Sequence, residues 1–179
     1  HYGYSSFAFD ITDYVDCDGV TENVVAVRAV NNLPSSRWYS GSGIYRDVTL
    51  IITEPVHVAY NGTYVTTPDI AEGKGTVQAV VELTNESGSS EEVTVKNTVY
   101  EYSSAEDADT VEPETAVSDT VETRVVLEAG GTAEGTAEPA GSDPTPWSTA
   151  APNMNIVRTE VHVAGAIADA DDTEFCLRW

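Results

Sequence analysis

The chain has 179 residues, of which 41% are hydrophobic, so it holds enough apolar material for one or two packed domains. It carries 30 acidic residues against 8 basic ones, which gives a net charge of −22. A field of this sign repels nucleic acid and anionic membranes, so both are excluded as partners. No apolar stretch approaches the ~20 residues that a membrane helix needs.

The acidic balance also suits a salt-rich environment, because dissolved ions screen the repulsion between carboxylates. We therefore hypothesise a halophilic source. The chain begins with His1-Tyr2 and shows neither an initiating Met nor a signal peptide, so we expect a piece of a longer protein. Cys17 and Cys176 are far apart and fit neither a disulfide framework nor a zinc site. Two buried or half-buried free thiols are expected.

In the first part of the chain, apolar residues alternate with polar ones, which favours strands. Strands are predicted over residues 1–14, where Phe7, Phe9 and Ile11 alternate with polar or small residues, and over residues 24–30 and 48–52. Between the first two, Asp16-Cys17-Asp18-Gly19 predicts a turn that lacks the spacing of a calcium loop. These residues are few for a closed sandwich, so earlier strands of this domain are expected to lie outside the chain.

A domain boundary is predicted at Glu54-Pro55, which divides the chain into domains 1–54 and 55–179. The second part shows about seven short strands, separated by turn residues every ten to fifteen positions. They are predicted over residues 56–65 with a turn at Asn61-Gly62, 77–84, 93–99, 117–127, 156–163 and 173–177. Residues 85–90 are expected to form a hairpin loop, 103–114 and 169–172 acidic solvated loops, and 130–146 an irregular segment. The pattern predicts an all-β fold, with an immunoglobulin-like β-sandwich in the second domain.

A short motif from Arg37 to Val48, Arg-Trp-Tyr-Ser-Gly-Ser-Gly-Ile-Tyr-Arg-Asp-Val, concentrates aromatic rings, arginines and a carboxylate. Sugars are bound by this mixture, because rings stack on the apolar faces of pyranoses while charged groups hold the hydroxyls. The alternative is a structured loop that leads into a core strand. His57 and His162 have no Ser or Cys beside them in a nucleophile setting, so a hydrolytic triad is not predicted.

Four segments in order resemble glycoside hydrolase family 2, and most of all its bacterial-type β-galactosidases. They are residues 3–14, 23–28, 37–48 and 147–179. The first three resemble the C-terminal part of the family's sugar-binding jelly roll, and the last resembles the end of its immunoglobulin-like domain. The chain departs from the family at Met154-Asn155, where relatives have Leu-Tyr, and at Cys176, where they have Gly. These departures affect the local geometry, since Gly adopts backbone angles that Cys does not.

The resemblance implies a retaining glycosidase, in which two glutamates about 5 Å apart act in a (β/α)8 barrel. That barrel would begin after Trp179, so no catalytic residue is expected in this chain, and the chain alone should be inactive. Asn85-Glu86 matches the family's acid/base dipeptide in letters only. Its polar surroundings predict a hairpin loop instead.

The resemblance also implies a role for Asp47, which would contact the galactosyl 6-hydroxyl and a sodium ion. A carboxylate suits both, because it accepts hydrogen bonds and offers a hard oxygen to a hard cation. The alternatives are a surface aspartate or a partner for Arg46. Arg37 and Tyr39 would line the same edge of the substrate site. Trp38, Ile44 and Tyr45 are expected to pack in the core or between domains.

The expected function is that of a non-catalytic accessory fragment of a bacterial or archaeal β-galactosidase. Its partners would be a β-galactoside, the enzyme's own catalytic barrel and further copies in a homo-oligomer. The fragment itself is expected to hold no cofactor, whereas the full-length enzyme would use sodium and magnesium. One alternative is another family 2 enzyme, a β-glucuronidase or β-mannosidase, although Asp47 would repel a glucuronide's carboxylate. The other is a non-catalytic carbohydrate-binding or adhesion module.

Overall fold

The structure is a computed structural model that describes residues 5–32, 41–71, 74–102, 116–139 and 146–177. The chain divides into two compact units, residues 1–50 and 51–179, which are described separately. Within the described ranges the only helix is the 3-10 helix η1 (Thr12–Tyr14). No helix in these ranges is long and apolar enough to cross a membrane.

No described residue before Val56 lies in a strand. The strands expected over residues 1–14, 24–30 and 48–52 are therefore wrong wherever the structure describes them. Their apolar side chains stay exposed, with Phe9 77% and Val25 74% accessible. A strand becomes stable by pairing with neighbours and burying one face of a sheet. The described part of this first unit offers neither, so the alternating pattern alone does not produce strands.

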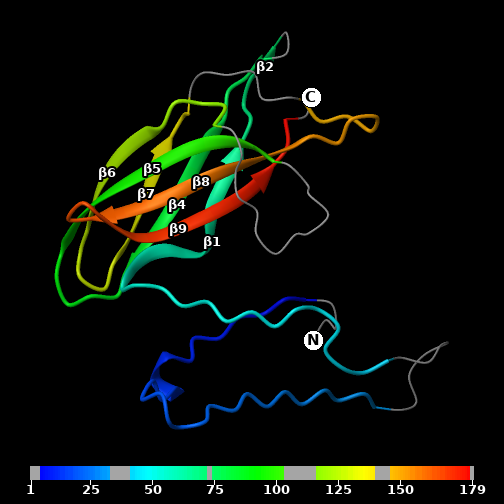
Figure 1. The fold of residues 1–179 in the computed structure, drawn as a ribbon, viewed down its shortest axis with the longest axis vertical. Helices are drawn as coiled ribbons and strands as arrows, with labels where there is room; N and C mark the ends of the chain where they lie inside the picture. The colour runs from blue at the N-terminus through cyan, green and yellow to red at the C-terminus, as the bar shows by residue number, and fades with distance from the viewer. Residues whose placement is uncertain (1–4, 33–40, 72–73, 103–115, 140–145, 178–179) are drawn as a thin grey trace. The chain divides into compact units, whose positions relative to one another are not determined.

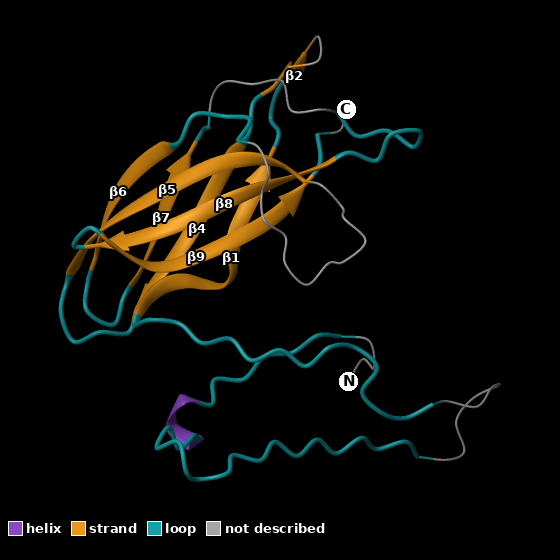
Figure 2. Ribbon diagram, viewed as in Figure 1, coloured by secondary structure: helices purple, strands orange, loops and turns teal. Residues whose placement is uncertain are grey.

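The second unit is an all-β sandwich of two antiparallel sheets, as the strand pattern predicts (Figures 1 and 2). The three-stranded sheet has the order β1-β4-β7, with β1 (Val56–Thr66), β4 (Gln78–Asn85) and β7 (Thr132–Ala137). The four-stranded sheet has the order β6-β5-β8-β9, with β5 (Glu91–Tyr102), β6 (Val121–Leu127), β8 (Met154–Val163) and β9 (Ala166–Phe175). A small hairpin joins β2 (Ile70–Ala71) and β3 (Lys74–Gly75).

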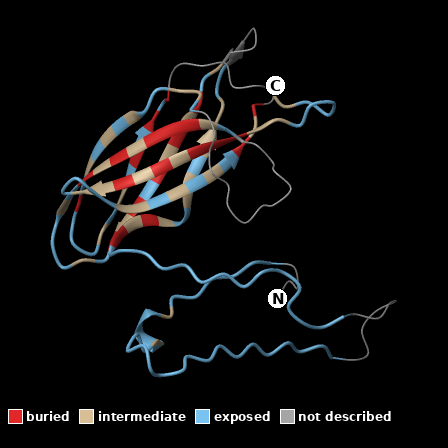
Figure 3. Cartoon of the chain, in the orientation of Figure 1, coloured by how far each residue is buried: buried red, intermediate tan, exposed pale blue. Residues whose placement is uncertain are grey.

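The core lies between the two sheets, and alternate side chains of the central strands β4 and β5 are buried in it (Figure 3). β-Branched valines dominate it, as expected for residues that pack well on a pleated surface. The core consists of two apolar clusters, one around Val81, Leu83, Val93, Val95, Leu127 and Val161, the other around Val77, Ala79, Val99, Val157, Phe175 and Leu177.

A buried polar pair interrupts this apolar core. Asn97 sits between Val95 and Val99 on β5, and Thr159 is its cross-strand neighbour on β8. The Thr159 hydroxyl donates a hydrogen bond of 2.8 Å to Asn97 Oδ1. The two apolar clusters therefore meet at a hydrogen-bonded layer that the sequence pattern did not predict.

Two segments expected to lack strands form strands instead. Residues 130–146 contain β7, which pairs with β4 through six residues. Its inward residues, Ala133, Gly135 and Ala137, are so small that they hide the apolar alternation. The acidic run 169–172, expected to be a solvated loop, lies inside β9. The other acidic loop, 103–114, falls outside the described residues.

β1 continues through Asn61-Gly62, where a turn was expected, because a bulge absorbs the extra residues there. The register jumps from Val58 opposite Leu83 to Thr63 opposite Val81, and Asn61 has a φ of 56°. Gly62 has no room for a side chain, since an added Cβ would lie 2.7 Å from the Ala59 carbonyl oxygen.

Two carboxylates of β9 bind β1 on either side of this bulge. Asp169 Oδ2 accepts a hydrogen bond of 2.9 Å from the Val58 backbone N–H. Asp171 Oδ2 accepts one of 3.0 Å from the Thr63 hydroxyl. The acidic residues of β9 thus connect the open edges of the two sheets, and inward-pointing charges of this kind also protect edge strands from pairing with other chains.

Candidate functional site

The segment that carries Asp47 is loop in the structure and lies in the first unit. Gly43 has a φ of 140°, which is strained for residues with a side chain. Arg46 lies 5.3 Å from the centre of the Tyr45 ring, and its Nη1 donates a 3.4 Å hydrogen bond to the Ser6 hydroxyl. Arg46 is therefore engaged by neighbours other than Asp47.

Asp47 is exposed, and no other described residue forms a hydrogen bond or an ion pair with it. The ion pair with Arg46, one of the alternatives for Asp47, is not formed between these two described residues. The carboxylate is free to accept hydrogen bonds from a ligand.

The structure describes only some of the other residues predicted for this site and its surroundings. Arg37 and Tyr39, together with Trp38, lie outside the described residues. Ile44 and Tyr45, expected to be packing residues, are 58% and 64% exposed. The structure therefore describes only Asp47 of the three predicted substrate-binding residues.

The turn at Asp16–Gly19 has the chemistry that its residues predict. The Asp18 carboxylate accepts hydrogen bonds from the backbone N–H groups of Val20 and Thr21 and from the Thr21 hydroxyl. These bonds, the Thr21 N–H first, lower the pKa of Asp18 to about 2. The carboxylate thus closes the turn as an acceptor, as aspartate does in many turns.

Asn85-Glu86 lies at the end of β4 and is followed by a loop, but β4 and β5 belong to different sheets, so the loop crosses between sheets and the expected hairpin is wrong. Asn85 is 0% exposed, and its Nδ2 donates to the carbonyl oxygens of Ser89, Leu127 and Glu128 at 2.8, 3.2 and 3.2 Å. Its Oδ1 accepts a hydrogen bond from the Ser87 backbone N–H at 2.9 Å. The Asn85 side chain links the loop after β4 to the loop after β6, and it is inaccessible to substrate.

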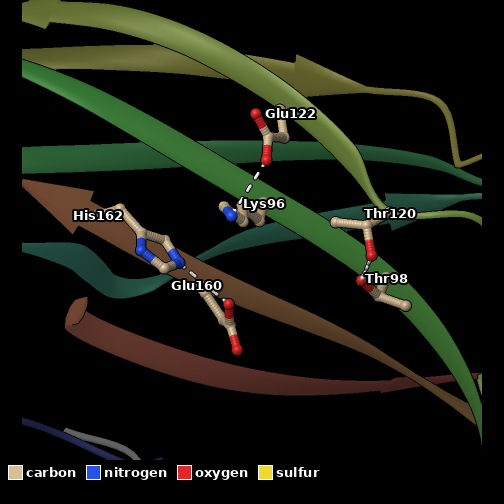
Figure 4. A network of polar contacts seen from close by, with 6 residues as sticks. All are labelled: Lys96, Thr98, Thr120, Glu122, Glu160 and His162. Atoms are coloured by element: carbon tan, nitrogen blue, oxygen red, sulfur yellow. Dashed lines mark hydrogen bonds and ion pairs between the residues drawn. The ribbon is translucent and has the colours of Figure 1, made fainter. Parts of the chain in front are cut away.

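The outer face of the four-stranded sheet carries paired charges (Figure 4). Lys96 Nζ lies 3.0 Å from Glu122 Oε1, and His162 Nε2 lies 3.0 Å from Glu160 Oε2. A hollow of about 440 Å³ lies beside these pairs and is lined partly by Arg124. None of its lining residues is a Phe, Tyr or Trp. A solvated polar face explains this arrangement, because one face of an antiparallel sheet commonly meets water.

Metal-ligating side chains do not gather anywhere in the described ranges, where no three or more His, Cys, Asp and Glu residues could hold an ion. Asp47 alone contributes one hard oxygen ligand, so a sodium site there would need further ligands. Both cysteines are free, as expected. Cys176 is half-buried, whereas Cys17 is exposed and departs from the expectation.

The sequence of the sandwich matches a known family along almost its entire length. Residues 56–178 match the sequence profile of the glycosyl hydrolases family 2, which is more than half of the chain. The chain belongs to glycosyl hydrolases family 2. This confirms the resemblance drawn from the four sequence segments.

Known proteins similar to this family 2 chain are considerably longer. Beta-galactosidase BoGH2A of Bacteroides ovatus is 46% identical over 110 residues, which cover 61% of this chain and 13% of the relative. A solved family 2 member from Bacteroides cellulosilyticus has a TM-score of 0.85 and 30% identity over 99% of this chain and 23% of its own. Bacteroides uniformis beta-glucuronidase shares the fold, with a TM-score of 0.59 and 19% identity over 71% of this chain and 15% of its own. The family 2 chain therefore spans between 13% and 23% of these relatives.

Sequence reasoning missed the buried polar residues Asn97, Thr159 and Asn155. A signal for the first two was present, because each interrupts a run of inward-facing valines in its strand. Both side chains are buried and hydrogen-bonded to each other, so their role in this family 2 chain is structural.

Proposed function

We propose that this chain is a non-catalytic accessory part of a longer retaining β-galactosidase that hydrolyses terminal β-galactosides. In this proposal the first unit supplies one wall of the substrate pocket, and the sandwich separates that wall from a catalytic barrel. The main observation behind this proposal is that Asp47 is exposed and pairs with no other described residue. It lies within a segment that resembles the family's substrate-contacting motif. The 46% identity to a beta-galactosidase supports the choice of substrate class.

Asp47 would act by accepting a hydrogen bond from the galactosyl 6-hydroxyl. A hydrogen bond to an ionised acceptor is stronger than a hydrogen bond between neutral groups. It contributes about 1.5–3 kcal/mol to binding. The same carboxylate would be one ligand of a sodium ion, with the others supplied by the longer protein. Bound sodium would add a hard cation that orients the 6-hydroxyl beside Asp47.

The sandwich would act as a spacer, and its C-terminal end is held firmly. Leu177 is 2% exposed, and its carbonyl oxygen accepts a 2.8 Å hydrogen bond from the Trp147 backbone N–H. Gly75 packs so closely against Leu177 that an added Cβ would clash with Leu177 Cδ2. A firmly held C-terminal end would keep the pocket wall aligned with the catalytic groups. Small displacements of these groups lower the rate of the reaction.

The test is Asp47→Ala in the full-length enzyme, with galactoside turnover as the measurement. We expect kcat/KM to fall by roughly ten- to a hundred-fold, because one charge-assisted hydrogen bond is lost in the transition state. Asp47→Asn keeps an acceptor oxygen without the charge, and should lose less activity but most of any sodium dependence.

A 6-deoxygalactoside provides the matched control, because it lacks the hydroxyl that Asp47 would bind. The wild-type enzyme and Asp47→Ala should turn over this substrate at similar rates. Unchanged turnover of the ordinary galactoside in Asp47→Ala, with unchanged sodium dependence, would remove Asp47 from the site.

A β-glucuronidase is the main alternative, but a free carboxylate at Asp47 would repel the substrate's own carboxylate. A non-catalytic carbohydrate-binding module is the alternative from another class. The sequence that follows Trp179 in the complete protein separates the proposals. A barrel with an Asn-Glu at a strand end favours an enzyme, whereas further β-sandwiches would rule one out.

A further inference from the structure

The outer face of the three-stranded sheet carries carboxylates that face each other. Glu82 on β4 and Glu134 on β7 are direct cross-strand partners, and both are exposed. The strands of this sheet contain no Lys or Arg. Within the sandwich strands, the basic residues Lys96, Arg124 and Arg158 all lie in the other sheet. The Glu82–Glu134 pair thus has no cation beside it in its own sheet.

No other described residue forms a hydrogen bond or an ion pair with the carboxylate of either glutamate. On its other side, Glu82 has no register partner in β1, because the bulge interrupts the pairing between Val58 and Thr63. Side chains directly opposite in an antiparallel pair have Cβ atoms about 4.5–5.5 Å apart, and like charges there oppose pairing. The fold therefore places two negative charges side by side, one on the central strand β4 and one on the short edge strand β7.

We propose that this pair makes folding of the sandwich depend on dissolved salt, with β7 as the salt-sensitive strand. The Debye length falls from about 10 Å at 0.1 M to about 3 Å at 1 M ionic strength, so it crosses the separation of the two carboxylates. Repulsion between Glu82 and Glu134 is strong in dilute buffer and largely screened in molar salt. The overall charge of −22 adds a diffuse repulsion of the same sign.

The experiment compares Glu134→Lys with a matched control, Glu174→Lys, in the complete chain. Glu174 lies on β9, also an edge strand, but its cross-strand partner is Ile156. Both variants change the net charge equally and differ in their surroundings: position 134 faces Glu82, whereas position 174 faces Ile156 and lies two residues from Asp172, which already pairs with Arg158. Melting temperature is measured in sodium chloride from dilute buffer to about 1 M.

We expect Glu134→Lys to melt about 2–5 °C above Glu174→Lys in dilute buffer, and this gap to shrink towards zero in molar salt. Any effect of salt on apolar burial is common to both variants and cancels in the comparison. The wild-type melting temperature itself should rise with salt.

A double-mutant cycle with Glu82→Gln and Glu134→Gln gives a second readout. The two substitutions should stabilise less together than the sum of their separate effects in dilute buffer, and should become additive in molar salt. Equal melting temperatures for the two lysine variants at every salt concentration would overturn the proposal. So would a wild-type melting temperature that does not change with salt.

Discussion

At the scale of single residues, Asn85 shows how a polar residue in a loop-like sequence can be part of the interior. The stretch around it, Asn-Glu-Ser-Gly-Ser-Ser, is typical of an exposed hairpin loop. The loop forms, but the Asn85 side chain turns inward and satisfies three backbone carbonyls and one N–H. A buried amide with all these bonds stabilises the junction, because unpaired buried carbonyls are costly.

We predict that Asn85→Ala lowers the free energy of unfolding by about 2–4 kcal/mol, since it leaves several buried polar groups without partners. Urea denaturation of the complete chain measures this loss. Ser87→Ala is the control, because the Ser87 hydroxyl makes an exposed hydrogen bond, and it should change stability by less than about 1 kcal/mol. Equal losses in the two variants would contradict the structural role of Asn85.

Asp18 provides a prediction for pH at the same scale. Its pKa is lowered from 3.8 to about 2, chiefly by the hydrogen bond from the Thr21 N–H. Because the folded pKa lies below the unfolded one, the turn is stabilised by this carboxylate above pH 3.8 and loses that support as pH falls through about 2. Carbon NMR of the Asp18 carboxyl group should show a midpoint well below 3.8.

The amide signals of Val20 and Thr21 should follow the same titration, since they donate to that carboxylate. In Asp18→Asn these two signals should no longer respond to acid in this range. A carboxyl midpoint at the ordinary value would show that the turn does not form in solution.

At the scale of strands, the predictions within the sandwich succeeded where inward residues are large and failed where they are small or acidic. β4, β5 and β8 carry apolar residues at most alternate positions, so their sequences display the buried face directly. β7 presents only Ala and Gly inward, and β9 directs Asp169 and Asp171 towards β1. The identity of such residues depends on what the opposite sheet offers, which the local sequence does not contain.

Two glycines of the three-stranded sheet allow a direct test of this packing. An added Cβ at Gly135 would meet Val125 Cγ2 at 3.4 Å, an ordinary contact, whereas one at Gly62 would meet the Ala59 oxygen at 2.7 Å. We predict that Gly135→Ala stabilises the chain by about 0.5–1 kcal/mol, because alanine restricts the unfolded chain and adds apolar contact.

Gly62→Ala should instead destabilise the chain by more than about 1 kcal/mol, because the clash is with backbone atoms. Thermal and urea unfolding of both variants provide the measurement. Destabilisation of the same size in both would show that the space beside Gly135 is smaller than the structure indicates.

At the scale of the whole molecule, the two units differ in how they hold themselves together. The second unit has a core of buried valines and leucines between paired sheets. In the first unit the described apolar residues, such as Val24 and Leu50, stay exposed. Burial of apolar surface is the main favourable contribution to folding, so stability should reside almost entirely in the second unit.

We predict that residues 51–179 expressed alone keep the sandwich and unfold cooperatively, within about 3 °C of the complete chain. Calorimetry measures the transition, and far-ultraviolet circular dichroism reports the strands. Residues 1–50 alone, the natural control, should show no cooperative transition. Loss of the transition in residues 51–179 would mean that the first unit contributes to the core.

The sequence by itself determined the all-β class, the sandwich and the family. These follow from local alternation of apolar residues, from turn residues and from ordered motifs, all of which lie along the chain. Of the predicted substrate residues, it singled out Asp47, which the structure leaves exposed and unpaired, while Arg37 and Tyr39 lie outside the described residues.

Only the tertiary structure decided which polar residues lie next to one another. The Asn97–Thr159 pair, the Asp169 and Asp171 bonds to β1 and the facing glutamates of β4 and β7 all join residues distant in sequence. Whether a polar side chain is buried, bonded or repelled depends on the neighbour that folding brings opposite it. That neighbour is set by the register of the strands and the bulge in β1, which the alternating pattern did not reveal.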